Sequence, residues 1–201
     1  MTTISERPNV VTPADWVPGP KQGNWTYDHY AALPDDGQRY EIVDGVLFLM
    51  TAAPNILHQK AVFGIASYLR TYVKDTDLGE VFIAPIDVKL TAETVVQPDV
   101  VVVLKAGFEK ITFSCIEGTP DLVVEVSSPR TVGHDRTEKQ FAYARAGVSE
   151  YWFVDPLAHT VEVLVVEGKA YKSLGVFSEE NTLPSLIVPT IEEVSVAKFF
   201  V

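Results

Sequence analysis

Two short apolar runs that each begin with the dipeptide Pro-Asp dominate the hydrophobic pattern of the chain. The first is PDVVVVL at residues 98–104, and the second is PDLVVEVSSP at residues 120–129. Their β-branched residues are bounded by proline and do not alternate strictly with polar residues, which is typical of strands buried on both faces. The pattern predicts two central strands that can be neighbours, with Asp99 at the start of the first and Glu125 inside the second.

The rest of the pattern predicts a mixture of helices and strands. Helices are expected at 26–33, with Thr26 as N-cap, at 55–75, and at 136–145, with Asp135 as N-cap and Gly147 just beyond the end. Asp44-Gly45 lies between two apolar runs and predicts a β-hairpin turn. Further strands are expected at 79–85, 86–90, 150–156, 160–166 and 169–175.

Composition predicts one globular domain. The chain has 201 residues, of which 47% are hydrophobic and 21% are charged. Four prolines before residue 21, without a sustained period, predict an extended arm at 1–25, followed by a single domain at 26–201. The single cysteine, Cys115, excludes an intrachain disulfide. The sequence has neither a leader pattern nor an apolar run long enough to span a membrane, so we expect a soluble, cytoplasmic protein with no membrane partner.

The two carboxylates on the Pro-Asp strands suggest a metal site. An unpaired buried charge costs on the order of 3 to 5 kcal/mol, so something cationic must face Asp99 and Glu125. Oxygen ligands alone favour Mg²⁺ or Mn²⁺, and no Cys/His cluster with zinc spacing occurs. Lys139, four residues after Asp135 on the expected helix, can supply a further positive charge. The alternative is a surface ion pair between Lys139 and Asp135.

Glu41 and His58 are weaker candidates. Glu41 lies on an expected strand between Tyr40 and Ile42, where a solvated strand face is an equally good interpretation. His58 falls in the first turn of the expected long helix, and lone histidines are usually surface or packing residues.

The motifs occur in an order that resembles a known family. YEIVDG, a helix with His58, QPDVVVV, PDLVVEVSSPRT, Asp135 with Lys139, and AGVSEYWFVDP follow one another over residues 26–190. This order is similar to the Uma-type family of restriction-endonuclease-like proteins, which is placed in the PD-(D/E)XK nuclease superfamily. The resemblance implies an α/β (mixed α+β) fold with a central mixed β-sheet flanked by helices.

The resemblance also implies roles for individual residues. Asp99 matches the metal-binding aspartate, Glu125 the acidic residue of the (D/E)XK element, and Glu41 an upstream glutamate. Ser127 stands where the superfamily has lysine, so Lys139 on the following helix would replace that lysine. The implied activity is Mg²⁺- or Mn²⁺-dependent endonuclease hydrolysis of DNA, with Asp99 and Glu125 as metal ligands and the main-chain carbonyl of Val126 as a third.

The charge of the chain limits how it can bind DNA. A net charge of −11 disfavours a general nucleic-acid binder, because phosphates attract basic side chains. A local strip is expected to contact substrate weakly and with strong salt dependence, and the substrate-binding candidates are His58, Arg130 and Arg136, with Lys60 and Arg70 on the long helix. We expect a homodimer, since cutting two strands usually needs two sites.

Two other hypotheses remain open. The chain can be an inactive nuclease-fold protein that acts as an interaction module, using the aromatic stretch EYWF at 150–153 as an exposed surface. Alternatively, it can be a metal-dependent hydrolase of a small phosphorylated molecule, for which a negative surface matters less.

Overall fold

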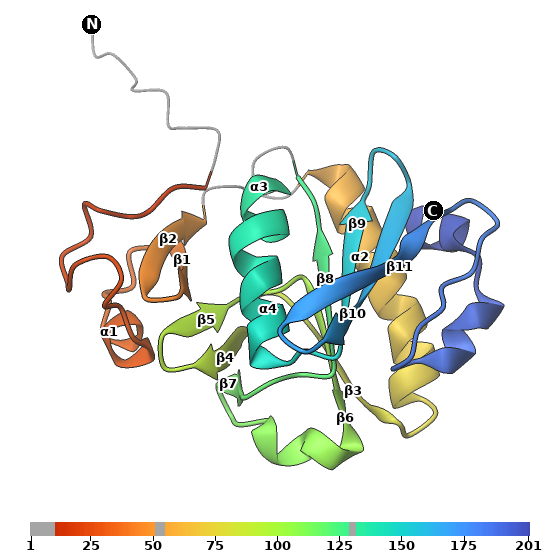
Figure 1. Cartoon of the computed structure of the whole chain (residues 1–201), viewed down its shortest axis with the longest axis horizontal. Coiled ribbons are helices and arrows are strands. Elements are labelled where there is room, and N and C mark those ends of the chain that lie inside the picture. The colour runs from red at the N-terminus through yellow and green to blue at the C-terminus, as the bar shows by residue number, and fades with distance from the viewer. Residues whose placement is uncertain (1–10, 51–54, 129–131) are drawn as a thin grey trace, which may run out of the picture.

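Two mixed β-sheets flanked by helices make up the computed structural model, which describes residues 11–50, 55–128 and 132–201 (Figure 1). The six-stranded sheet has the order β11 (Ala170–Ser178), β10 (Thr160–Glu167), β9 (Glu150–Asp155), β8 (Leu122–Val126), β6 (Val100–Leu104) and β3 (Gly79–Ile83). The five-stranded sheet has the order β2 (Val46–Met50), β1 (Arg39–Val43), β5 (Thr94–Val96), β4 (Asp87–Thr91) and β7 (Cys115–Glu117). The expected mixed α/β fold is confirmed, although two sheets replace the single one expected.

The two Pro-Asp strands are neighbours, as the sequence predicts. β6 and β8 pair in antiparallel fashion, with Val100 opposite Val124, and every residue of β8 is buried. Extending this register by one residue places Asp99 opposite Glu125. On its other side, β8 pairs in parallel with β9, so it lies in the interior of the sheet.

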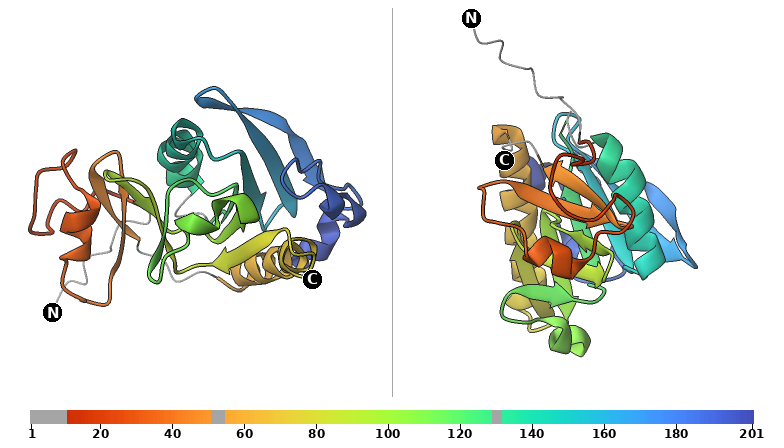
Figure 2. Two further views of the ribbon diagram at one scale, coloured as in Figure 1. Left: turned by 90° about the horizontal axis from the view of Figure 1, so that it is seen from below. Right: turned by 90° about the vertical axis from the view of Figure 1, so that its left-hand side faces the viewer.

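One face of the six-stranded sheet is covered by the long helix that the sequence predicts. Helix α2 (Ile56–Leu69) is continued by a π-helical turn, η1 (Arg70–Lys74), and the side chain of its N-cap, Asn55, accepts a hydrogen bond from the backbone N–H of His58. Helix α2 packs against the C-terminal 3₁₀ turn η5 (Val196–Phe200), and Figure 2 shows the two side by side.

The opposite face is covered by a second helix that starts earlier than predicted. It comprises α3 (Val132–His134), η3 (Asp135–Lys139) and α4 (Gln140–Ala146), and it ends at Gly147, which has a φ of 84°. The prediction that Asp135 caps this helix is wrong, because His134 already has helical φ and ψ angles. Asp135 therefore lies inside the helix, with its side chain buried against the sheet.

The Asp44-Gly45 turn is also present, and the N-terminal segment packs on it. Both turn residues have positive φ angles, 52° and 75°, as a hairpin turn of this kind requires. The described part of the expected arm lies against this hairpin: the N–H of Ala14 donates to the Leu47 carbonyl, and Trp25 is buried. Helix α1 (Tyr27–Ala31) follows, with Thr26 as its N-cap, as predicted.

Two further 3₁₀ turns complete the described elements: η2 (Lys105–Lys110) follows β6, and η4 (Pro189–Glu193) precedes η5. The aromatic stretch at 150–153 is not an exposed surface. Tyr151, Trp152 and Phe153 are all buried, because β9 is an interior strand covered on both faces. That part of the interaction-module hypothesis is wrong. In the part of the chain that the structure describes, no helix is long and apolar enough to cross a membrane.

The close contact between α2 and η5 predicts that a side chain at Gly64 destabilises the fold. Replacing glycine by alanine inside an exposed helix usually stabilises it by about 1 kcal/mol. Here an added Cβ would lie 2.2 Å from the carbonyl oxygen of Phe199. We expect Gly64→Ala to lower the free energy of unfolding by about 1–3 kcal/mol in urea titration. Ser67→Ala, at an exposed position of the same helix, should change it little, and a Gly64→Ala protein as stable as wild type would contradict this packing.

Candidate active site

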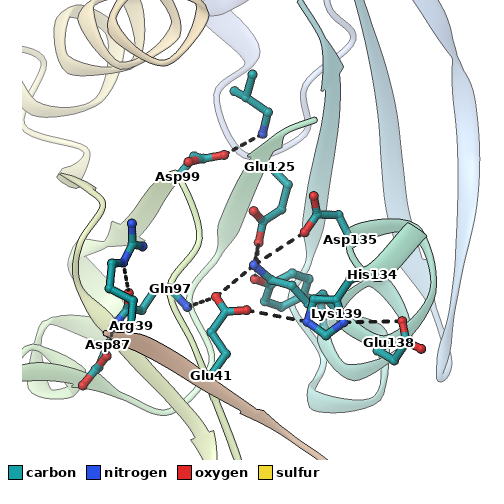
Figure 3. A network of polar contacts seen from close by, with 12 residues as sticks. Arg39, Glu41, Asp87, Gln97, Asp99, Glu125, His134, Asp135, Glu138 and Lys139 are labelled. Carbon is teal, nitrogen blue, oxygen red and sulfur yellow. Dashed lines mark hydrogen bonds and ion pairs between the residues drawn. The ribbon is translucent and has the colours of Figure 1, made fainter. Parts of the chain in front are cut away.

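A single buried ammonium group, that of Lys139, lies among carboxylates from three different elements. Its Nζ is 2.6 Å from Oε1 of Glu125 on β8, 3.1 Å from Oε1 of Glu41 on β1, and 3.8 Å from Oδ1 of Asp135 (Figure 3). None of these four side chains is more than 5% exposed. We call this group the acid–lysine cluster.

The local sequence explains why Glu125 and Lys139 meet. Alternation along β8 directs Val124 and Val126 to the α2 side and Glu125 to the side of the second helix. The i,i+4 spacing places Asp135 and Lys139 on one face of that helix. The structure places the Lys139 ammonium against Glu125, as expected. The alternative of a surface pair with Asp135 is wrong, because both side chains are buried.

Glu41 is fully buried, so the interpretation as a solvated strand face is wrong. Its Oε1 accepts a hydrogen bond from the backbone N–H of Gln97 at 2.7 Å as well as from Lys139. Its Oε2 is 3.7 Å from Nε2 of His134, and neither atom has a hydrogen-bond partner among the described residues. Glu41 therefore joins the five-stranded sheet to the helix that carries Lys139.

Asp99 lies at the edge of the acid–lysine cluster. Its Oδ2 accepts a hydrogen bond from the backbone N–H of Val126 at 2.8 Å and is 3.2 Å from Nε2 of His58. The side chain of Asp99 is 18% exposed, more than those of the cluster. The structure thus brings His58, at the start of α2, to the aspartate of the first Pro-Asp strand.

Burial and neighbouring charges shift the pKa values of the two glutamates of the cluster in opposite directions. The pKa of Glu125 is raised well above its usual range, mainly by burial and further by the nearby carboxylates of Asp135, Asp99 and Glu41, which together outweigh Lys139. Burial and the neighbouring carboxylates therefore favour the neutral form of Glu125.

The pKa of Glu41 is shifted in the opposite direction, downwards. Burial acts to raise its pKa, but the Lys139 ammonium, His134 and the N–H of Gln97 lower it to about 2. Lys139 itself has a raised pKa, because the attraction of Glu125, Glu41 and Asp135 exceeds the effect of burial. Glu41 and Lys139 therefore form the ionised pair of the cluster.

The expected basic strip is only partly near this site. The guanidinium of Arg136 is 2.8 Å from Glu162 and stacks on Phe153, so its charge is already compensated. Lys60 is exposed on α2, whereas Arg70 lies twelve residues beyond His58, about 18 Å along the helix axis. Arg130 lies outside the described residues.

Four further residues belong to this region that the sequence did not single out. The Tyr143 hydroxyl donates to Oε1 of Glu125 at 2.6 Å, and its position one helical turn after Lys139 was a usable signal. The ring of His134 packs on Phe48 next to Glu41. Gln97 and Arg39 are linked by a hydrogen bond of 2.9 Å, and neither has a sequence pattern of its own.

Asp99 opposite Glu125, with the buried Lys139 beside them in a mixed α/β fold, is the arrangement that the family resemblance leads one to expect. The chain belongs to the Uma2 family, described as "Putative restriction endonuclease", whose family model matches residues 27–197. A search of curated proteins found no significant match.

Among solved structures, the fold is similar to that of "a putative nuclease belonging to DUF820 from Anabaena variabilis". The TM-score is 0.69, with 20% sequence identity, and the alignment covers 87% of this chain and 97% of that one. At this identity the likeness establishes the fold.

Because the pKa values of Glu41 and Glu125 are shifted in opposite directions, replacing each glutamate by glutamine should have a different effect on stability. The stability that ionised Glu41 contributes is present above its ordinary pKa of 4.5 and is lost as the pH falls towards 2. We expect Glu41→Gln to lower the free energy of unfolding by about 3 kcal/mol at neutral pH, and by progressively less below pH 4.5.

Glu125→Gln is the matched control. A raised carboxyl pKa costs stability as the pH rises above the ordinary value, since the unfolded chain then releases a proton that the folded chain keeps. Glutamine imitates the neutral acid, so Glu125→Gln should be at least as stable as wild type at neutral pH. Urea titrations of both variants between pH 3 and pH 8 test this, and equal losses in the two variants would contradict the assignment.

Proposed function

We propose that the protein is a Mg²⁺- or Mn²⁺-dependent endonuclease that hydrolyses phosphodiester bonds of DNA. The observation that carries the proposal is the placement of Asp99 opposite Glu125 on adjacent strands, with the Lys139 ammonium 2.6 Å from Glu125. Membership of the Uma2 family and the similar nuclease fold support it.

The two acids fit a hard cation with oxygen ligands. Asp99 contacts Val126 and His58 through Oδ2, and Glu125 contacts Tyr143 and Lys139 through Oε1. Within the described residues, the other carboxylate oxygens, Asp99 Oδ1 and Glu125 Oε2, have no hydrogen-bond partner. The described residues contain no cluster of three or more His, Cys, Asp or Glu side chains able to hold a metal. Mg²⁺ commonly takes one or two carboxylates and completes its shell with water. Asp99, Glu125 and the carbonyl of Val126 would be the protein ligands.

The chemistry divides between the cation and the side chains around it. A bound Mg²⁺ would lower the pKa of a water molecule and offset the negative charge of the phosphate. Lys139, kept protonated by its carboxylate neighbours, would orient the attacking water or stabilise the pentacovalent phosphorus. Glu41 would hold the ammonium in place, and Tyr143 would fix one oxygen of Glu125. Lys139 would thereby replace the lysine that is absent at Ser127.

DNA binding should be weak and salt-sensitive. The net charge of −11 opposes a polyanion, so attraction must be local. Lys60 and Arg39 are the cations that we propose for this attraction, with His58 next to Asp99. We further propose that the protein acts in the cytoplasm as a homodimer, which analytical ultracentrifugation would test.

Plasmid nicking tests the activity. Wild type should nick supercoiled DNA with Mg²⁺ or Mn²⁺, and chelation should abolish nicking. Asp99→Asn and Glu125→Gln should each lower the rate at least a hundredfold, because each replaces a proposed carboxylate ligand of the cation by an amide, and the cation would stabilise the transition state. Glu109→Gln, at an exposed position on η2, is the control and should keep the wild-type rate. Equal rates in all four proteins would assign the nicking to another site or to a contaminant.

Calorimetry with Mg²⁺ separates the proposal from an inactive interaction module. We expect heat of binding from wild type and Glu109→Gln, and none from Asp99→Asn, since that variant loses an anionic ligand. No heat from wild type would favour the module. Strong inhibition of nicking by mononucleotides would favour a small phosphorylated substrate instead.

A further inference from the structure

An open pocket of about 450 Å³ is linked to the acid–lysine cluster through Gln97 and has no part in the chemistry proposed above. It is lined by residues of α1, β3, β4 and β7 and by the segments between them, among them Tyr30, Ile83, Asp87, Gln97 and Phe113. Its volume falls within the range of small-molecule sites, about 300–1,000 Å³.

One wall of the pocket carries a carboxylate with a free oxygen. Asp87 Oδ1 accepts hydrogen bonds from Gln97 Nε2 at 2.8 Å and from the Tyr30 hydroxyl at 3.1 Å. Burial and the Asp87 charge raise the pKa of Tyr30, so it remains a donor. Among the described residues, Asp87 Oδ2 has no partner, and Asp87 is in no ion pair. The wall therefore presents an unused hydrogen-bond acceptor.

The other wall is apolar and faces solvent. Phe113 is fully exposed and Ile83 is 55% exposed, and both line the pocket. An aromatic ring held open to solvent has no packing role in the fold, but its face is available for stacking on a flat ligand.

The pocket is joined to the candidate active site through Gln97. The Gln97 side chain contacts Asp87 in the pocket, while its backbone N–H donates to Glu41 of the cluster at 2.7 Å. Gln97 is two residues before Asp99, at most about 7 Å along the chain. Arg39 donates to Gln97 Oε1 at 2.9 Å, and within the described residues its guanidinium has no carboxylate partner.

We propose that this pocket binds a nucleobase bearing an exocyclic amino group, from an unpaired nucleotide of the DNA strand whose phosphate lies at Asp99 and Glu125. Phe113 stacks on the base, Asp87 Oδ2 accepts from the amino group, and Arg39 contacts a neighbouring phosphate. This inference rests on the proposed function, because it takes DNA as the ligand.

The two walls of the pocket contribute separately to the affinity for a base and to the selectivity between bases. Stacking on an aromatic ring tolerates every base, so Phe113 supplies affinity without selectivity. A carboxylate accepts from the amino group of cytosine but repels the carbonyl that thymine has in its place. Cytosine should therefore bind more tightly than thymine, although the two rings are similar in size.

Fluorescence anisotropy with labelled decamers of deoxycytidine and of deoxythymidine tests this, using the full chain at neutral pH with chelator to prevent cleavage. Wild type should bind the cytidine decamer more tightly. Phe113→Ala should weaken binding of both decamers about tenfold or more. Phe63→Ala is the matched control, because Phe63 is 76% exposed on α2 and away from the pocket.

Asp87→Asn should remove the preference for cytidine while retaining binding, because an amide offers a donor as well as an acceptor. Melting temperatures would confirm that each variant is folded. Equal binding of the two decamers by wild type, or wild-type affinity in Phe113→Ala, would overturn the proposal. A free deoxycytidine monophosphate that binds as tightly as the decamer would also overturn it, because the ligand would then not be a DNA strand.

The two proposals fail in different ways. If the cytidine decamer binds in a Phe113-dependent manner but no metal-dependent nicking occurs, the base pocket is supported and the proposed nuclease activity is contradicted. If nicking depends on Asp99 and Glu125 but Phe113→Ala changes neither nicking nor decamer binding, the nuclease activity is supported and the base pocket is contradicted.

Discussion

One ammonium group in a region of four carboxylates is the constraint on which the rest of the structure depends. Lys139 contacts Glu41, Glu125 and Asp135, and Asp99 lies close enough to raise the pKa of Glu125. A single positive charge cannot balance four negative ones in a medium of low dielectric constant. The surroundings respond to this imbalance by lowering the pKa of Glu41 and raising that of Glu125. An excess of carboxylates over fixed cations is also what a site for an added cation needs.

The same contacts hold the parts of the fold together. Glu41 belongs to the five-stranded sheet, Glu125 to the six-stranded sheet, and Lys139 to the helix that packs against both. The ion pair between Glu41 and Lys139 is thus a polar connection between layers that also share an apolar core. Removing one partner of such a pair leaves a buried charge, so the geometry of the site and the stability of the domain are linked.

The sequence predicts the parts of this arrangement that depend on local pattern. The β6 and β8 strands, helix α2 with Asn55 at its start, and the turn at Asp44-Gly45 all follow from residue type and spacing. Spacing on the expected helix suggested that Lys139 compensates the carboxylates, and the resemblance to a nuclease family strengthened this link. Local pattern does not say which strands become interior, so it left the burial of Glu41 open and misjudged the stretch at 150–153.

The error at Asp135 has the same origin. An aspartate before a helical stretch is a good cap when its surroundings are exposed, and only tertiary packing shows that this one faces a buried lysine. Gln97 was equally invisible, because its role comes from contacts with Glu41, Arg39 and Asp87 on other strands. Such roles require the sheet to be assembled before they can be seen.

If the proposed function holds, an acidic protein acts on a polyanion and must attract it at a few points, which the distribution of ion pairs helps to locate. Among the described residues, many cations are already paired: Arg136 with Glu162, Arg145 with Asp44, Lys74 with Glu80, Lys105 with Asp77 and Lys172 with Glu167. Arg39 has no such partner in the described parts of the chain, and it lies next to Gln97 (Figure 3). A bound cation at Asp99 and Glu125, together with Arg39, would then carry most of the attraction for phosphate. Contacts to a neutral base add affinity without adding charge, so a base pocket suits a protein whose net charge opposes its substrate.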